Sequence, residues 1–206
     1  MLLSFGLSFA QSPQITNGLN YLATSQNSDG SWGDEFSETW TLPSTFSVME
    51  TLRVLNQTNT QSYSSALFWL QSQPSDITEY LSERIQLLLI SGADSELLVS
   101  YFNQIFNAWG GYEGFKANNY DTVFALQALK KINYSDQNKI DLGLIYLLIT
   151  QNSDGGWGFR HGDDSEVYYT SLFSLALQQF PSTTSRATAI NKATSHLIAH
   201  QNADGG

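Results

Sequence analysis

The side chains best suited to metal or nucleophilic chemistry are scarce in this chain. None of its 206 residues is cysteine, which removes thiolate metal ligands, a cysteine nucleophile and disulfides. Of the three histidines, His196 and His200 lie four residues apart, a spacing at which two imidazoles on one helix face can hold a metal ion. No carboxylate in the local sequence is placed to join them. We therefore expect these histidines to lie on a solvated helix face, and we expect no metal and no other cofactor.

Carboxylates gather in residues 161–166, which read His-Gly-Asp-Asp-Ser-Glu. This stretch stands just before a predicted helix that begins near Tyr168, where negative charge is stabilised by the helix dipole. Capping and solubility explain it, and contact with a cation or a substrate, with Tyr169 nearby, is the alternative. Asp121 stands in the same relation to a helix predicted from Thr122 onward, and its side chain is expected to be the N-cap.

A repeated motif positions these residues. The segments 26–33 and 151–158 both read Gln-Asn-Ser-Asp-Gly-x-Trp-Gly, and a third copy begins at Gln201 and runs to the last residue. In all three copies a small residue stands eight positions before the Gln, and a leucine stands four positions before it. Such long shared spacing indicates a repeat architecture. Each copy is expected to contain the end of one helix, a tight glycine-containing loop and the approach to the next helix.

Hydrophobic periodicity predicts two kinds of helix between these loops. Segments that are apolar on one face predict five outer helices, whereas segments that are apolar on nearly every face predict four inner helices surrounded by protein. Strands are disfavoured because Ala and Leu dominate the apolar runs. The expected outer helices are 17–25, 64–71, 95–106, 142–149 and 185–200, and the expected inner helices are 45–55, which is intermediate in character, 84–90, 122–129 and 170–177.

Composition indicates a packed domain and excludes two classes of partner. Hydrophobic residues make up 41% of the chain and charged residues 14%, and the formal net charge is −10. No cluster of Lys and Arg is present to neutralise phosphates, which argues against binding of nucleic acid. No apolar run approaches the roughly 20 residues that a transmembrane helix needs.

The N-terminal segment differs from the rest of the chain. Residues 1–12 begin with the apolar run 1–10, which ends in a small-x-small pattern, yet they lack the basic residue that opens a signal peptide. We expect them to be the remnant of a signal peptide or an N-terminal arm, followed by a repeat domain over 13–206. A surface rich in Ser, Thr, Asn and Gln favours an extracellular or periplasmic location.

The repeated motif resembles the QW repeat of the terpenoid cyclase and protein prenyltransferase superfamily, whose fold is an α/α toroid. The matching copies are 18–32, 143–157 and, as far as it runs, 193–205, with degenerate copies at 66–73 and 101–111. In that superfamily the Gln side chain hydrogen-bonds at a helix end and the Trp stacks against it. The resemblance predicts this structural role for Gln26, Trp32, Gln151, Trp157 and Gln201. The resemblance predicts a partial or open toroid of about nine helices, truncated at its C-terminal end.

The resemblance also locates a candidate acid. In squalene-type cyclases the proton donor is the middle Asp of an Asp-x-Asp-Asp-Thr-Ala-like segment that opens an inner helix. The matching residues 118–123 read Asn-Asn-Tyr-Asp-Thr-Val, so Asn118 and Tyr120 stand at the first and third positions. An acid that protonates an alkene needs neighbours that tune its pKa and hold its anion, and Asp121 lacks them in the local sequence. The candidate acids are Asp121 and the carboxylates Asp163, Asp164 and Glu166.

The prenyltransferase branch of the superfamily holds zinc with Asp, Cys and His, and the lack of cysteine excludes that form of site. In enzymes of the superfamily, aromatic rings stabilise carbocations through their π faces. The resemblance therefore gives an expected cavity lining of Phe46, Tyr120, Phe124, Tyr168, Tyr169 and Phe173.

Two functions follow from these observations. The missing catalytic residues favour a module that binds an isoprenoid or other apolar ligand, or a protein segment, in its cavity. The alternative is a divergent terpenoid cyclase or prenyltransferase-like enzyme that acts on an isoprenoid. An inner-helix carboxylate facing an enclosed aromatic pocket favours the enzyme, and a shallow or filled centre favours the binding module.

Overall fold

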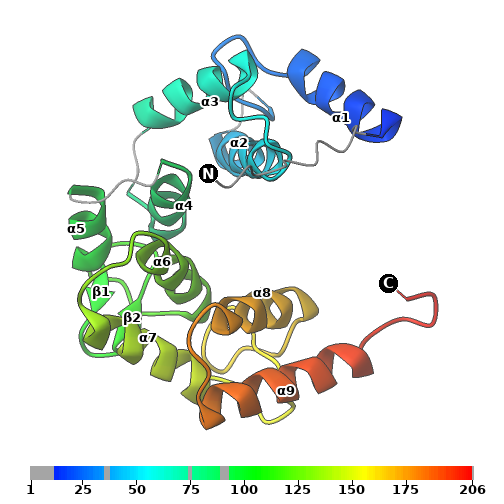
Figure 1. Ribbon diagram of the computed structural model, residues 1–206. Coiled ribbons are helices and arrows are strands. Elements are labelled where there is room, and N and C mark those ends of the chain that lie inside the picture. Colours follow the sequence, from blue (N-terminus) through cyan, green and yellow to red (C-terminus); the bar gives the residue numbers. More distant parts are fainter. Residues whose placement is uncertain (1–11, 35–37, 74–75, 89–92, 206) are drawn as a thin grey trace, which may run out of the picture. The chain divides into compact units, whose positions relative to one another are not determined.

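The computed structural model describes residues 12–34, 38–73, 76–88 and 93–205, which form two compact units divided after Gln73 (Figure 1). The first unit contains α1 (Pro13–Thr24), α2 (Glu38–Val54) and α3 (Gln61–Ser72). The second contains α4 (Thr78–Leu88), α5 (Ala93–Ser100), α6 (Asn119–Lys131), α7 (Gln137–Ile149), α8 (Val167–Gln178) and α9 (Thr184–Ala199). The predicted all-α fold is confirmed. The expected N-terminal arm lies almost wholly outside the described residues.

The predicted helix 95–106 was wrong, and the inner helices expected over 45–55 and 84–90 begin earlier, at Glu38 and Thr78. The segment 95–106 is not a single helix, because α5 ends at Ser100 and a two-stranded antiparallel ribbon follows. The ribbon pairs β1 (Phe102–Asn103) with β2 (Ala108–Trp109). Between the strands, Asn107 takes a left-handed backbone conformation with φ of 54°, which Asn tolerates better than most residues.

The second unit has two layers of helices. In the inner layer α6 packs against both α4 and α8, and in the outer layer α7 contacts α9 (Figure 1). The core between the layers holds the fully buried side chains of Trp109, Trp157 and Phe173. Among the described residues, no helix is both long enough and apolar enough to cross a membrane.

A tryptophan in each of three connections between helices joins an outer helix to the inner helix that follows it. The Trp backbone N–H donates to the hydroxyl of a threonine thirteen residues further on, in pairs Trp32–Thr45 at 2.9 Å, Trp109–Thr122 at 3.1 Å and Trp157–Thr170 at 3.0 Å. The indole N–H donates backward to an outer-helix carbonyl, that of Leu22 at 2.7 Å, Leu98 at 3.0 Å or Leu147 at 2.8 Å. We call these paired bonds the Trp–Thr link. The three threonine acceptors are fully buried, so the links fix where each inner helix lies.

The glutamine of each full motif joins one outer helix to the next. The Gln151 amide donates to the carbonyl of Gly155 at 2.8 Å and to that of Ala189 in α9 at 2.9 Å. Gln26 makes the equivalent bonds to Gly30 and Ser62, each at 2.8 Å. In the third copy the Gln201 amide donates to the Gly205 carbonyl at 3.0 Å.

Gly155, the glycine of the second motif's loop, cannot be replaced without strain. Gly155 has a φ of +89°, and a Cβ at this residue would lie 2.6 Å from the Lys192 carbonyl oxygen in α9. Only glycine combines this backbone conformation with so close an approach.

We predict that Thr170→Val lowers the free energy of unfolding by about 1–3 kcal/mol, because it leaves the buried Trp157 N–H without an acceptor while keeping the side-chain shape. Urea titration followed by circular dichroism measures this change. Thr188→Val is the matched control, since Thr188 is an exposed residue of α9 whose hydroxyl bonds only its own helix. Equal stability losses in the two variants would contradict the role of the Trp–Thr link.

Candidate functional site

A pocket of about 660 Å³ lies among the loops at the N-terminal end of α6. Residues 106–117 form one side of it, residues 159–161 form another, and Asp121 and Tyr146 complete the wall. Its aromatic lining is Phe106, Tyr112, Phe115, Tyr146 and Phe159. The pocket therefore offers apolar ring surfaces together with one carboxyl group.

Asp121 is buried in the first turn of α6, with only 5% of its surface exposed. Its predicted role as N-cap was wrong, because α6 begins at Asn119 and the cap is Asn118, whose side-chain oxygen accepts from the Asp121 N–H at 2.8 Å. The Asn118 amide in turn donates to Asp121 Oδ2 at 2.5 Å. Burial raises the pKa of Asp121, and the hydrogen bond from Asn118 partly offsets that rise.

A second acidic site lies between α4 and α6. The Tyr120 hydroxyl donates to Glu79 Oε1 at 2.6 Å, and burial raises the pKa of both side chains. One turn further along α4, Glu83 Oε2 is buried with no hydrogen-bond partner among the described residues, and burial raises the Glu83 pKa well above its ordinary value. Sequence reasoning missed both glutamates as site residues. The available signal was their spacing of four residues, directly before the predicted inner helix 84–90.

Aromatic rings from three elements meet beside this acidic site. Tyr120 of α6 stacks on Phe159 with ring centroids 5.3 Å apart, and Tyr169 of α8 contacts Phe159 at 5.7 Å. Phe124, Tyr168 and Phe173 extend the cluster through contacts with Tyr120 or Tyr169. Five of the six aromatic residues singled out in the sequence thus lie together. The sixth, Phe46, is buried in α2 of the first unit.

Phe159 was not singled out by sequence reasoning, yet it belongs to both the pocket and the aromatic cluster. It follows Trp157 by two residues, so the Trp–Thr link of that repeat positions its ring. The sequence feature that could have identified it is its position directly after the repeated motif.

The carboxylates Asp163, Asp164 and Glu166 are exposed and do not line the pocket with Asp121. Asp163 Oδ2 accepts from the Arg160 N–H at 2.9 Å, which shapes the loop. Glu166 occupies the N-cap position of α8 but makes no side-chain capping bond. These three carboxylates therefore lie outside the pocket that Asp121 lines, although His161 of the same stretch lines it.

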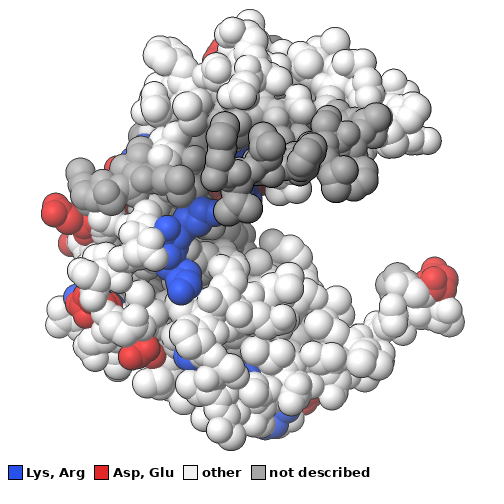
Figure 2. All heavy atoms as spheres, viewed as in Figure 1, with Lys and Arg blue, Asp and Glu red and all other residues white. Residues whose placement is uncertain are grey.

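Two cationic side chains and one histidine lie at the same pocket. Lys116, Arg160 and His161 line it, and neither Lys116 nor Arg160 forms an ion pair among the described residues. The Arg160 guanidinium lies over the Phe159 ring, 5.3 Å from its centroid. On the face seen in Figure 2, the largest group of Lys and Arg atoms lies over the region of α4 and α6, and smaller groups are scattered elsewhere. At the pocket itself, Lys116 and Arg160 bring positive charge together on a chain of net charge −10, which the linear sequence conceals because the two residues lie far apart.

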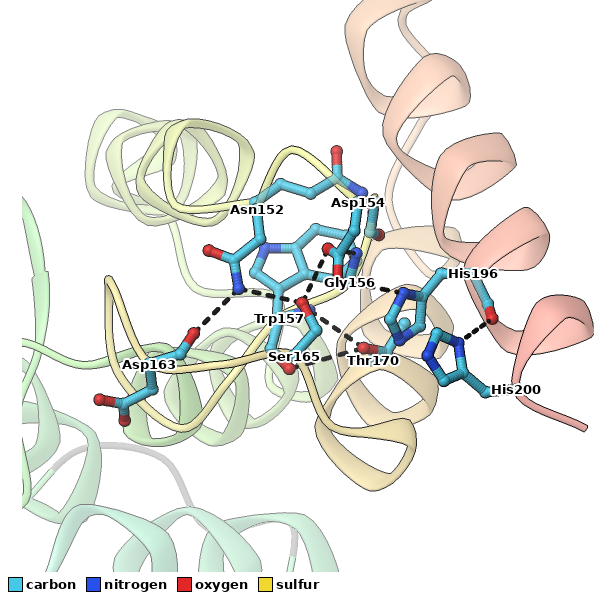
Figure 3. A network of polar contacts seen from close by, with 11 residues as sticks. Asn152, Asp154, Gly156, Trp157, Asp163, Ser165, Thr170, His196 and His200 are labelled. Atoms are coloured by element: carbon cyan, nitrogen blue, oxygen red, sulfur yellow. Dashed lines mark hydrogen bonds and ion pairs between the residues drawn. The ribbon is translucent and has the colours of Figure 1, made fainter.

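The two neighbouring histidines belong to a separate polar network (Figure 3). The expectation of a solvated face was wrong for His196, which is only 4% exposed. Its Nδ1 atom lies 3.5 Å from Asp154 Oδ2, and its ring stacks on that of His200 with centroids 4.1 Å apart. Asp154 also accepts from the Ser165 hydroxyl at 2.8 Å. These contacts join α9 to the loop of the second motif.

We predict that Glu83→Gln stabilises the protein at neutral and alkaline pH but not in acid. A raised pKa means that the contribution of Glu83 to stability is present below its ordinary pKa of 4.5 and is lost as pH rises through the pKa of the folded state. A glutamine side chain does not ionise, so the variant keeps this contribution to stability as pH rises. Urea midpoints of variant and wild type at about pH 4 and about pH 8 measure the effect.

The exposed Glu96 of α5 supplies the control variant, Glu96→Gln, because a solvated carboxylate has no burial to relieve. A difference between Glu83→Gln and wild type that is the same at both pH values would contradict the buried acidic site.

No protein-family model matches this chain. Among curated proteins, it is 39% identical over 61 residues to the drimenyl diphosphate synthase of Streptantibioticus cattleyicolor, a match that covers 30% of this chain and 11% of that protein. Among solved structures, it is similar to ent-copalyl diphosphate synthase from Streptomyces platensis, with a TM-score of 0.64 and 16% identity. That match covers 89% of this chain and 39% of the other. The chain thus spans well under half the length of either protein, and its fold is the helical, terpenoid cyclase-like fold that its repeats predict.

Proposed function

We propose that this domain binds an isoprenoid with an anionic head, such as a diphosphate ester, in the pocket beside Asp121, and does not itself protonate the ligand. The observation that carries the proposal is that one pocket combines aromatic walls with Lys116 and Arg160, whose charged groups form no ion pair among the described residues. Cations bind phosphate oxygens through charge-assisted hydrogen bonds, and the rings offer an apolar surface to the hydrocarbon chain.

The size of the pocket fits such a ligand. Ligand pockets commonly enclose about 300–1,000 Å³ and combine apolar walls with a few polar groups. At about 660 Å³ this pocket falls within that range. His161 adds a third donor on the same side as Arg160.

The residue at the position of the catalytic acid in the cyclases that this chain resembles favours binding rather than catalysis. Tyr120 stands where those enzymes carry the proton-donating Asp, and a phenol is a far weaker acid than a carboxylic acid. Burial and the neighbouring Glu79 raise the pKa of Tyr120 further, and its proton is already donated to Glu79. A side chain in this state cannot protonate an alkene.

The names of the two similar proteins support the choice of ligand class, since both are diphosphate synthases. The matched parts make up 11% of the first of these proteins and 39% of the second.

A second candidate function rests on Asp121. This carboxyl group lines the pocket, burial raises its pKa, and the Asn118 amide contacts its Oδ2. A protonated Asp121 facing a bound alkene would be an acid catalyst of the cyclase type.

Calorimetric titration with farnesyl diphosphate and with farnesol tests the binding proposal. The double variant Lys116→Gln/Arg160→Gln is expected to bind farnesyl diphosphate at least about tenfold more weakly than wild type, because it loses charge-assisted hydrogen bonds. Its affinity for farnesol should not change. Lys131→Gln, an exposed cation at the C-terminal end of α6, is the control and should bind as wild type does.

Equal affinity of the double variant and wild type for farnesyl diphosphate, or no binding by wild type, would refute the proposal. Mass spectrometry of the extracted ligand after incubation decides between the two functions. A new isomer formed by wild type but not by Asp121→Asn would establish catalysis by Asp121.

A further inference from the structure

We propose a second, smaller binding site in this protein, for an organic anion with a short apolar tail, between the end of α8 and the start of α9. A pocket of about 270 Å³ lies there, lined by residues that do not belong to the pocket beside Asp121. Its volume is just below the range of about 300–1,000 Å³ typical of ligand sites, so the ligand is smaller than an isoprenoid diphosphate.

The central residue of this site is Arg186, a buried cation without a counterion. Only 9% of its surface is exposed, and it forms no ion pair among the described residues. Its Nη2 donates to the Pro181 carbonyl, but its buried Nε has no hydrogen-bond partner among the described residues. A buried charge that lacks a counterion is costly, and an anion in the pocket that Arg186 lines would supply that counterion.

The surroundings of Arg186 are positive as well. It lies in the first turn of α9, a 16-residue helix whose N-cap is Thr183, and a helix N-terminus attracts anions and disfavours a cation. The Lys130 ammonium lies over the Phe180 ring, 5.8 Å from its centroid, and Phe180 lines the pocket. No Asp or Glu occurs from residue 167 to residue 203, although the whole chain has 19 acidic residues.

The pocket walls define the rest of the ligand. Leu177, Phe180 and Ile190 give it apolar sides, whereas Ser182 and Asn191 add hydrogen-bonding groups. A carboxylate or phosphate group next to Arg186, with a short apolar tail against the rings and aliphatic side chains, satisfies both surfaces.

Nitrogen-edited NMR titration with hexanoate, hexanamide and inorganic phosphate tests this site. Hexanoate should shift the amide signals of residues 182–191, and the uncharged hexanamide should not. Arg186→Met should weaken hexanoate binding at least about tenfold, since it removes a charged hydrogen-bond donor. Lys192→Gln is the control, because Lys192 is an exposed cation of the same helix and does not line the pocket.

Ile190→Trp provides a second variant, which fills the pocket while keeping Arg186, and it should also abolish the shifts. Shifts by phosphate as well as hexanoate would support an anion site that accepts either head group. The inference is overturned if Arg186→Met binds hexanoate as tightly as wild type, or if hexanoate and hexanamide shift the same signals. It stands apart from the isoprenoid proposal, because the two pockets share no residue.

Discussion

The bond between a tryptophan N–H and a threonine hydroxyl is the contact on which the rest of this structure depends. It occurs three times with the same thirteen-residue separation, and each time the indole N–H also holds the preceding outer helix. Because the donor and acceptor are buried, the inner helix has one place to begin. At the second of these links, Thr122 is the acceptor. Asp121 precedes it in the first turn of α6 and lines the pocket at the N-terminal end of that helix.

The residues between each linked Trp and Thr differ between the repeats, and they supply much of the pocket lining. The segment from Trp109 to Thr122 contains Lys116 and Asp121, and the segment from Trp157 to Thr170 contains Phe159 and Arg160. The repeat thus supplies a rigid frame, and its variable loops build a positive, aromatic pocket on an acidic protein. Function on such a fold is set by these loops rather than by the helices that hold them.

Sequence reasoning recovered what depends on local pattern and missed what depends on contacts between distant segments. The helix faces and the repeated Gln and Trp were visible because they recur at fixed spacing. The pairing of Tyr120 with Glu79 was not, since the two residues lie on different helices. Lys116 and Arg160 were likewise missed because only the fold brings them together. His196 appeared exposed because nothing in its own helix indicates Asp154 as a partner.

The most direct test is to locate the bound isoprenoid by nuclear Overhauser effects between farnesyl diphosphate methyl groups and aromatic ring protons. If the loops form the site, the methyl groups will contact Tyr112 and Phe115, which line the pocket with Asp121. Contacts confined to Phe124 and Phe173 would contradict this account, because those rings belong to the aromatic cluster of α6 and α8 and not to the pocket.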